Sequence, residues 1–226
     1  MPIQSIAFDL DDTLIDTTGL LAPKASEKAF QILIDAGLAL NFAQCEQKRL
    51  ELIKTMSHKE AFKLLAEQYG TPQTLNVLEL ANKAFYYPDI PATLPLLPQA
   101  LENLQTLSKK YTLYLVTAGV REAQLAKVKA LNIGHFFKKI FIVNSLKQEK
   151  KYHAFESIIK DEQIKPEDLL CIGNSLSSEI KDARQIGAIA CYFEFGEDRG
   201  SVSTDPNLKP HYTTTNHKDL IHVCHL

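Results

Sequence analysis

Two acidic side chains follow a short apolar run near the N-terminus, and their spacing suggests chemistry. Residues 6–8 are apolar and lead directly into Asp9, with Asp11 two positions further on. Side chains alternate along a strand, so both acids lean to the same side as the backbone leaves a sheet. Ligands of open α/β sheets bind beyond the carboxyl ends of the strands. Two carboxylates at that edge can share a hard cation.

An aspartate at this place can also act as a nucleophile toward phosphorus. Its unperturbed pKa is about 3.9, so it is ionised at neutral pH and needs no base. Mg²⁺ would offset its repulsion from an anionic phosphate. The alternative is a polar turn in which Asp12 or Asp16 caps a helix. The acids alone do not decide between these interpretations.

A second apolar run, at 113–116, ends in Thr117, Ala118 and Gly119. A threonine hydroxyl at a strand terminus, with the amides of the following turn, can hold phosphate oxygens. Threonine is also a common strand former, so this signal is weak when taken alone.

Two further sets of polar residues lie near the starts of predicted helices. Lys147, Lys150 and Lys151 crowd the approach to one helix, and each, judged from the residues alone, is a solvated surface charge. An apolar run at 169–173 leads into Asn174, with Glu179 five residues later. A turn at Asn174 that caps the next helix is compatible with a functional role.

Strand-like and helical patterns alternate along most of the chain. Strands are predicted around residues 6–8, 113–117, 140–143, 169–173 and 188–193, and helices around 99–108, 122–131, 153–161 and 178–186. This alternation predicts an α/β fold with a doubly wound parallel sheet.

The interval between the first two strands breaks the alternation. Apolar residues at helical spacing predict several helices there, with Gly37 and Gly70 placed as C-terminal caps. Prolines between 88 and 98 then stiffen the return. We expect a core domain of residues 1–18 and 92–226 and a helical domain of residues 19–91. The aromatic residues 85–87 are expected to pack this junction, the alternative being that they line a cleft.

The four segments resemble, in order, the motifs of the haloacid dehalogenase superfamily, of the phosphatase type with a helical C1-type cap. Asp9, Asp11 and Thr13 match the first motif, Asp-x-Asp-x-Thr. The resemblance implies that Asp9 attacks phosphorus and that Asp11 acts as acid and base. It places Thr117 and the amide of Ala118 on the phosphate. An acid at position 11 argues against the carbon-halogen branch.

The resemblance also assigns the lysine and the metal ligands. Of the three lysines, Lys150 best fits the family's distances, with Lys151 next. Asn174 and Glu179 stand where the family usually has two aspartates, so Mg²⁺ would be held by Asp9, Asp11, Asn174 and Glu179. The exchange of an acid for Asn174 removes one negative charge, which predicts weaker Mg²⁺ binding.

Composition sets the outer limits. With 226 residues and 45% hydrophobic content the chain can bury a large core, and a net charge of −2 without a basic stripe gives no sign of a nucleic-acid or membrane surface. No segment approaches the ~20 apolar residues of a membrane span. The four cysteines fit neither a zinc pattern nor a disulfide scaffold. We expect a soluble cytoplasmic protein; its oligomeric state is open.

The leading hypothesis is a Mg²⁺-dependent phosphatase that acts on a small phosphorylated metabolite. One alternative is a catalytically weak binding or regulatory protein, which the altered fourth motif favours. Another is a phosphomutase, which uses the same nucleophile but returns the phosphate to a sugar. The identity of the substrate is not readable from the sequence.

Overall fold

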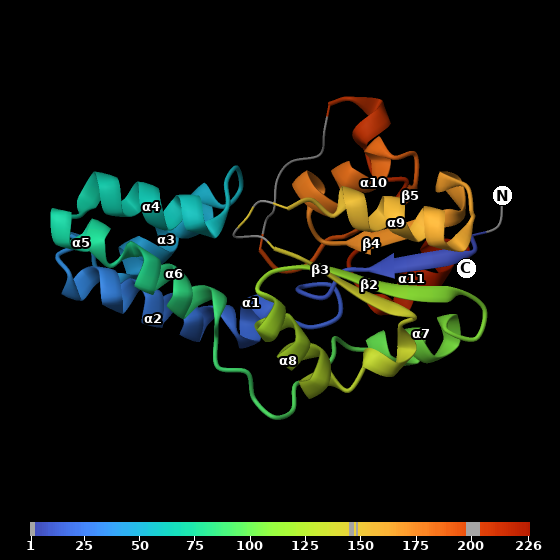
Figure 1. The fold of residues 1–226 in the computed structure, drawn as a ribbon, viewed down its shortest axis with the longest axis horizontal. Helices are drawn as coiled ribbons and strands as arrows, with labels where there is room; N and C mark the ends of the chain where they lie inside the picture. Colours follow the sequence, from blue (N-terminus) through green and yellow to red (C-terminus); the bar gives the residue numbers. More distant parts are fainter. Residues whose placement is uncertain (1–2, 145–146, 148, 198–203) are drawn as a thin grey trace.

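The computed structural model describes residues 3–144, 147, 149–197 and 204–226. Figure 1 shows a central sheet covered by helices on both faces, with a group of helices extending away from one end of the sheet. The chain thus has an α/β core and a helical insert, here defined as α2–α6.

The sheet is entirely parallel, with the strand order β3-β2-β1-β4-β5-β6. The strands are β1 (Ser5–Phe8), β2 (Thr112–Ala118), β3 (Lys139–Val143), β4 (Leu169–Gly173), β5 (Ile189–Phe193) and β6 (Tyr212–Thr214). The first strand lies between β2 and β4, so the residues that follow it emerge at the centre of the sheet.

Helices connect the strands and form the insert. They are α1 (Thr17–Leu20), α2 (Ala22–Asp35), α3 (Phe42–Leu52), α4 (His58–Tyr69), α5 (Pro72–Asn76), α6 (Leu78–Tyr86), α7 (Ala100–Leu107), α8 (Arg121–Leu131), α9 (Tyr152–Glu162), α10 (Lys181–Gln185) and α11 (His217–Val223). A π-helical turn, Leu176–Ile180, leads into α10.

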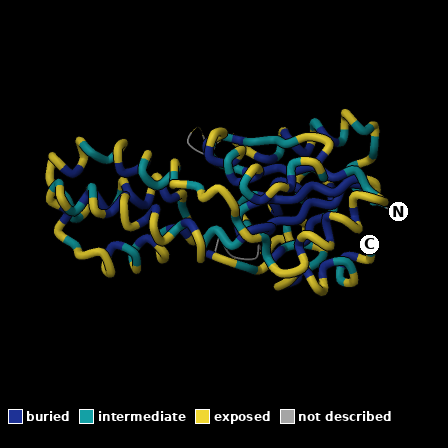
Figure 2. The backbone as a smooth tube through the Cα atoms, turned by 90° about the horizontal axis from the view of Figure 1, so that it is seen from below, coloured by how far each residue is buried: buried dark blue, intermediate teal, exposed yellow. Residues whose placement is uncertain are grey.

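The two faces of the sheet bury different side chains because the side chains of each strand alternate. Ile6 and Phe8 of β1 join one apolar cluster with residues of α7, α8 and α11. Ala7 points the other way, into a second cluster with residues of α9 and α10. The central strands β1, β2, β4 and β5 are mostly buried on both faces, as the dark tube in Figure 2 shows, whereas the edge strands β3 and β6 are partly exposed. This confirms the predicted doubly wound parallel sheet.

The helical insert has an apolar cluster of its own. Phe30, Leu33, Phe62, Leu65 and Ala81 are fully or almost fully buried in it. By contrast, α7 packs on the core although it also lies between β1 and β2. The division at residues 18/19 and 91/92 stays a prediction, but separate clusters are what a distinct helical domain requires.

The predicted strands are confirmed, and the predicted core helices lie close to the observed α7, α8, α9 and α10. Strand β6 was not expected, because its three residues are too few to show a period. The helix expected over 178–186 begins instead as the π-helical turn. Within the described residues, no helix combines the length and apolar character needed to cross a membrane.

Phe62 gives a test of the insert's apolar cluster. Its ring is 0% exposed and lies 5.0 Å from that of Phe30 and 5.2 Å from that of Phe85. We expect Phe62→Ala to lower the free energy of unfolding by about 3–5 kcal/mol, since it leaves a cavity. Leu80→Ala, at a side chain that is 56% exposed, should change it by less than about 0.5 kcal/mol. Urea denaturation followed by circular dichroism measures both, and equal effects would contradict the packing described.

Candidate active site

Parallel pairing brings the predicted site residues to one edge of the sheet. Phe8, the last residue of β1, pairs with Leu115 of β2 and with Ile172 of β4. The next residue, Asp9, donates its amide hydrogen to the carbonyl oxygen of Ile172 at 2.8 Å. Asp9 therefore leaves the sheet between the ends of β2 and β4. Thr117 lies near the end of β2, and Asn174 directly follows β4.

A buried lysine holds two acids together at this edge. Lys151 Nζ lies 2.6 Å from Asp9 Oδ1 and also contacts Glu179 Oε1. The three side chains are almost completely buried, with Lys151 only 1% exposed. A buried charge needs an opposite charge nearby, and here one ammonium serves two carboxylates.

Burial dominates the electrostatics of this group. It raises the pKa of Asp9 to about 7; the Lys151 ammonium opposes this rise, while Glu179 and Asp11 add to it. Burial also acts to lower the pKa of Lys151, but the carboxylates of Asp9 and Glu179 outweigh it and the pKa of Lys151 is raised. Lys151 therefore stays charged.

The choice of Lys150 as the lysine that faces Asp9 is wrong. Lys150 is exposed to solvent, whereas its neighbour Lys151 is buried against Asp9. Lys151 is the lysine whose ammonium reaches both buried carboxylates, Asp9 and Glu179. Beside it, Asp182 Oδ2 accepts a hydrogen bond from the amide of Tyr152 at 3.0 Å and fixes the start of α9. Lys147 is also exposed.

Glu179 reaches Lys151 because Gly173 leaves room for it. A Cβ atom at position 173 would lie 2.6 Å from Glu179 Cγ. The second carboxylate oxygen of Glu179 accepts a hydrogen bond from the Ser175 amide at 3.0 Å. Both oxygens of Glu179 are thus engaged by the protein, in the π-helical turn that follows β4.

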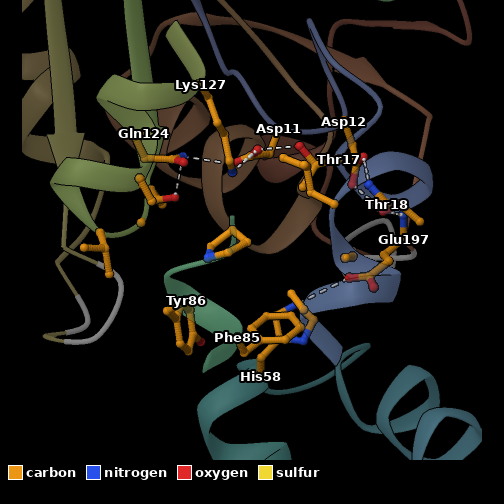
Figure 3. A pocket seen from close by; sticks show the side chains of 18 of the residues that line it. Asp11, Asp12, Thr17, Thr18, His58, Phe85, Tyr86, Gln124, Lys127 and Glu197 are labelled. Atoms are coloured by element: carbon orange, nitrogen blue, oxygen red, sulfur yellow. Dashed lines mark hydrogen bonds and ion pairs between the residues drawn. The ribbon is translucent and has the colours of Figure 1, made fainter. Parts of the chain in front are cut away.

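Asp11 has a lysine of its own. Lys127 Nζ donates to Asp11 Oδ1 at 2.6 Å, Thr17 Oγ1 donates to the same oxygen at 2.5 Å, and Gln124 Nε2 donates to Oδ2 at 2.8 Å (Figure 3). Burial alone would raise the pKa of Asp11, but Lys127 and the other donors lower it below its usual value. Asp9 and Asp11 thus have opposite pKa shifts.

Thr117 is linked to the same group. Its hydroxyl oxygen accepts a hydrogen bond from Gln124 Nε2 at 2.6 Å, and its side chain is fully buried. Gln124 Nε2 also donates to the carbonyl oxygen of Ala118 at 3.1 Å. Gln124 therefore joins the predicted second motif to Asp11.

Sequence reasoning missed Gln124 and Lys127, although a signal exists. The two residues are three positions apart on α8, so they share a helix face. Ala123 and Val128 are buried on the same helix. This helix directly follows a candidate phosphate-binding turn. Long polar side chains at its buried positions therefore suggest a functional site.

The polar-turn interpretation of the first motif holds as well. Asp16 Oδ1 caps α1 by accepting from the amide of Gly19 at 2.6 Å. Asp12 accepts hydrogen bonds from the amide and the hydroxyl of Thr18, at 2.8 and 2.7 Å. These turns hold the loop between β1 and α1, and with it Asp11.

A cavity of about 220 Å³ lies between this edge of the sheet and the helical insert. Figure 3 shows Asp11, Gln124 and Lys127 along one side and His58, Phe85 and Tyr86 along another. The expectation that residues 85–87 only pack the junction is corrected for Phe85 and Tyr86, which line the cavity. Tyr87 is 46% exposed.

A buried ion pair joins the core to the insert beside the cavity. Glu197 follows β5, and its Oε1 accepts from Arg49 Nη1 of α3 at 2.7 Å. Its Oε2 lies 3.3 Å from His58 Nε2 of α4. Arg49 also donates to Glu46 at 2.9 Å. The sequence offered no pattern for this contact, because its members are far apart in the chain.

The donor atoms at the sheet edge suit a hard cation such as Mg²⁺. Asp9 Oδ2, Asn174 Oδ1 and the main-chain oxygen of Asp11 accept no hydrogen bond from the described residues. Oxygen ligands of these types are what Mg²⁺ prefers. No cluster of three or more His, Cys, Asp or Glu side chains suited to a metal occurs in the described ranges.

Lys151 and Lys150 form a matched pair for a stability test. Lys151→Met leaves Asp9 and Glu179 buried without a cation, and we expect a loss of about 3–5 kcal/mol in the free energy of unfolding. Lys150→Met, at an exposed position, should change it by less than about 0.5 kcal/mol.

The loss in Lys151→Met should also grow as the pH rises. Without the lysine, the pKa of Asp9 in the folded protein rises further above its unfolded value, so the folded state binds more protons and is destabilised at higher pH. Urea titrations at pH 5 and pH 8 measure this. A loss that shrinks toward pH 8 would refute the assigned ion pair.

Known proteins support what the geometry indicates. The model of the family described as haloacid dehalogenase-like hydrolase matches residues 6–192. The chain is 29% identical over 205 residues to a glyceraldehyde 3-phosphate phosphatase of Pyrococcus furiosus, covering 86% of this chain and 82% of the relative. It is 30% identical over 192 residues to a protein of the same name from Methanothermobacter thermautotrophicus, covering 83% and 84%.

Solved structures share the fold over the whole chain. The putative hydrolase YfnB of Bacillus subtilis, bound to magnesium, superposes with a TM-score of 0.69 at 22% identity and full coverage of both chains. A predicted phosphoglycolate phosphatase of Haemophilus somnus gives a TM-score of 0.73 at 19% identity, covering 98% of each chain. The sheet, the insert after β1 and the sequence match agree, and the chain belongs to the haloacid dehalogenase-like hydrolase family.

Proposed function

We propose that this protein is a Mg²⁺-dependent phosphatase that hydrolyses a small phosphate monoester through an aspartyl-phosphate intermediate. The observation that carries the proposal is the pair of carboxylates after β1, each with its own lysine: Asp9 with Lys151 and Asp11 with Lys127. The two carboxylates have different surroundings in the free protein: burial raises the pKa of Asp9, and Lys127 with the other donors lowers the pKa of Asp11.

In the first step, a carboxylate oxygen of Asp9 attacks phosphorus and the bond between phosphorus and the ester oxygen breaks. Asp11 gives a proton to the departing oxygen, so an alcohol leaves. Asp11 must carry that proton although its pKa is lowered in the free protein. The negative charge of a bound phosphate raises the pKa of a neighbouring carboxyl and so favours protonation at that moment.

In the second step, water attacks the phosphorus of the aspartyl-phosphate and Asp11 takes up its proton. The bond between phosphorus and the Asp9 oxygen breaks, inorganic phosphate leaves, and the carboxylate of Asp9 is restored. The Lys151 ammonium stabilises the negative charge of the Asp9 carboxylate before the attack and again when the bond to phosphorus breaks. The hydroxyl of Thr117 and the amide of Ala118 would hold phosphate oxygens, because the oxygen of Thr117 already accepts from Gln124 and its hydrogen remains to be donated.

Mg²⁺, when bound, would offset the charge repulsion between Asp9 and the phosphate. Asp9, Asn174 and the main-chain oxygen of Asp11 would hold it. Glu179 would act behind these ligands, since both of its oxygens already bind protein groups. Lys151 takes the role first given to Lys150.

The cavity and the relatives support a proposal for the substrate class. The cavity is small and is lined by both apolar and polar side chains. Relatives at 29% and 30% identity carry the name glyceraldehyde 3-phosphate phosphatase. A short phosphorylated carbon chain is the substrate that we propose.

A panel of short phosphate esters tests the proposal, with phosphate release measured with Mg²⁺ and with EDTA. We expect metal-dependent release, and we expect Asp9→Asn to lower it by at least about 1,000-fold while the fold is kept. Asp89→Asn is the control, since that side chain is 72% exposed on the linker after the insert.

Release by Asp9→Asn at the wild-type rate would refute the mechanism. Transfer of phosphate back to a sugar without net release would point to the phosphomutase alternative. Absence of Mg²⁺ binding at millimolar metal, together with no release from any ester, would favour a binding role.

A further inference from the structure

Lys127 is placed at the junction between the acid Asp11 and the cavity. It lies on α8, its side chain is 8% exposed, and its Nζ atom is 2.6 Å from Asp11 Oδ1. It also belongs to the lining of the cavity. The mechanism described above pairs Lys127 with Asp11 but gives it no contact with the substrate.

The ammonium of Lys127 has N–H donors that Asp11 does not use. A lysine ammonium carries three N–H groups and accepts none. Among the described parts of the chain, Asp11 Oδ1 is the acceptor within hydrogen-bond distance of Lys127 Nζ. The remaining donors are therefore available to a molecule in the cavity, toward which the side chain points in Figure 3.

Orientation of Asp11 does not by itself explain a buried lysine. Thr17 and Gln124 donate to the two different carboxylate oxygens of Asp11 and already fix its plane. Lys127 balances the charge of the Asp11 carboxylate, and its ammonium carries further N–H groups that Asp11 does not use. A positive charge at this place is suited to an electronegative atom of the ligand.

The position of Lys127 relative to the reaction defines that atom. Asp11 protonates the ester oxygen of the substrate, so this oxygen lies against the Asp11 carboxylate. An oxygen on the adjacent carbon, in a gauche arrangement, lies about one hydrogen-bond length from the ester oxygen. Lys127 contacts the same carboxylate and is within reach of that second oxygen.

We propose that Lys127 binds a hydroxyl or carbonyl oxygen on the carbon next to the ester carbon, and that this contact makes the enzyme selective for phosphate esters with an oxygen at that position. The inference rests on the proposed phosphatase function. It adds a requirement on the substrate that the two carboxylates alone do not impose.

Two esters that differ by one hydroxyl test this: glycerol 3-phosphate and the monophosphate of 1,3-propanediol, which lacks the central hydroxyl. We expect the wild-type protein to favour glycerol 3-phosphate by at least about tenfold in kcat/KM, as one hydrogen bond to a charged group predicts. Lys127→Met should reduce this ratio to about one.

Lys129→Met is the matched control, since Lys129 is exposed on the same helix; it should keep the wild-type ratio. The ratio is taken within one variant, so the fraction of folded protein cancels. Lys127→Gln, which keeps an uncharged donor, replaces Lys127→Met if that variant does not fold, and its ratio should fall between those of the wild type and one.

The outcomes distinguish a failure of the inference about Lys127 from a failure of the proposed phosphatase function. A wild-type ratio near one, or activity only on panel esters that lack an adjacent oxygen, overturns the inference while the phosphatase stands. An unchanged ratio in Lys127→Met with equally lowered rates shows that Lys127 only positions Asp11, and also overturns it. No phosphate release from any ester refutes the proposed function itself.

Discussion

The buried contact of Lys151 with Asp9 and Glu179 is the constraint around which the core is arranged. Its members come from the end of β1, the start of α9 and the turn after β4, so all three segments must meet. Apolar side chains of the same volume would often stabilise a fold as well as a buried ion pair does. The presence of charge at this place is therefore better explained by chemistry than by stability. Gly173 and Asp182 serve this contact, one by leaving space for Glu179 and the other by fixing the start of α9.

Asp11 lies two residues from Asp9 but in a different electrostatic environment. Asp9 is almost fully buried and shares its lysine with Glu179, so burial raises its pKa. Asp11 receives hydrogen bonds from one lysine and two neutral donors, and its pKa is lowered. The difference arises from α8, which carries Gln124 and Lys127 on one face. A single strand end thereby presents two carboxylates in different electrostatic environments, and in the proposed mechanism these are the nucleophile and the proton carrier.

The helical insert completes the site from the opposite side. Its apolar cluster is separate from the clusters on the sheet, and the cavity lies where the insert and the core meet. Glu197 of the core contacts Arg49 and His58 of the insert beside this cavity. The ring of Phe85 lies against that of His58 in a tilted arrangement, with ring centroids 4.5 Å apart. Phe85 therefore adds an apolar side chain of the insert to the cavity lining. The shape of the cavity thus depends on residues of both units, whereas the phosphate chemistry depends on the core.

Local patterns were enough to determine the parallel α/β sheet, the helical segment after β1, and the positions of Asp9, Asp11, Thr117 and Asn174 at strand ends. Each of these follows from side-chain periodicity or from residues adjacent in the chain. Tertiary structure decided which lysine is buried, because Lys150 and Lys151 are neighbours with the same chemistry and only the folded chain places one of them against Asp9 and Glu179. It also decided the contact of Asp11 with Lys127 and the contact of Glu197 with Arg49, whose members are separated by 116 and 148 residues. Contacts over such separations depend on the packing of whole elements, and no local sequence pattern encodes that packing.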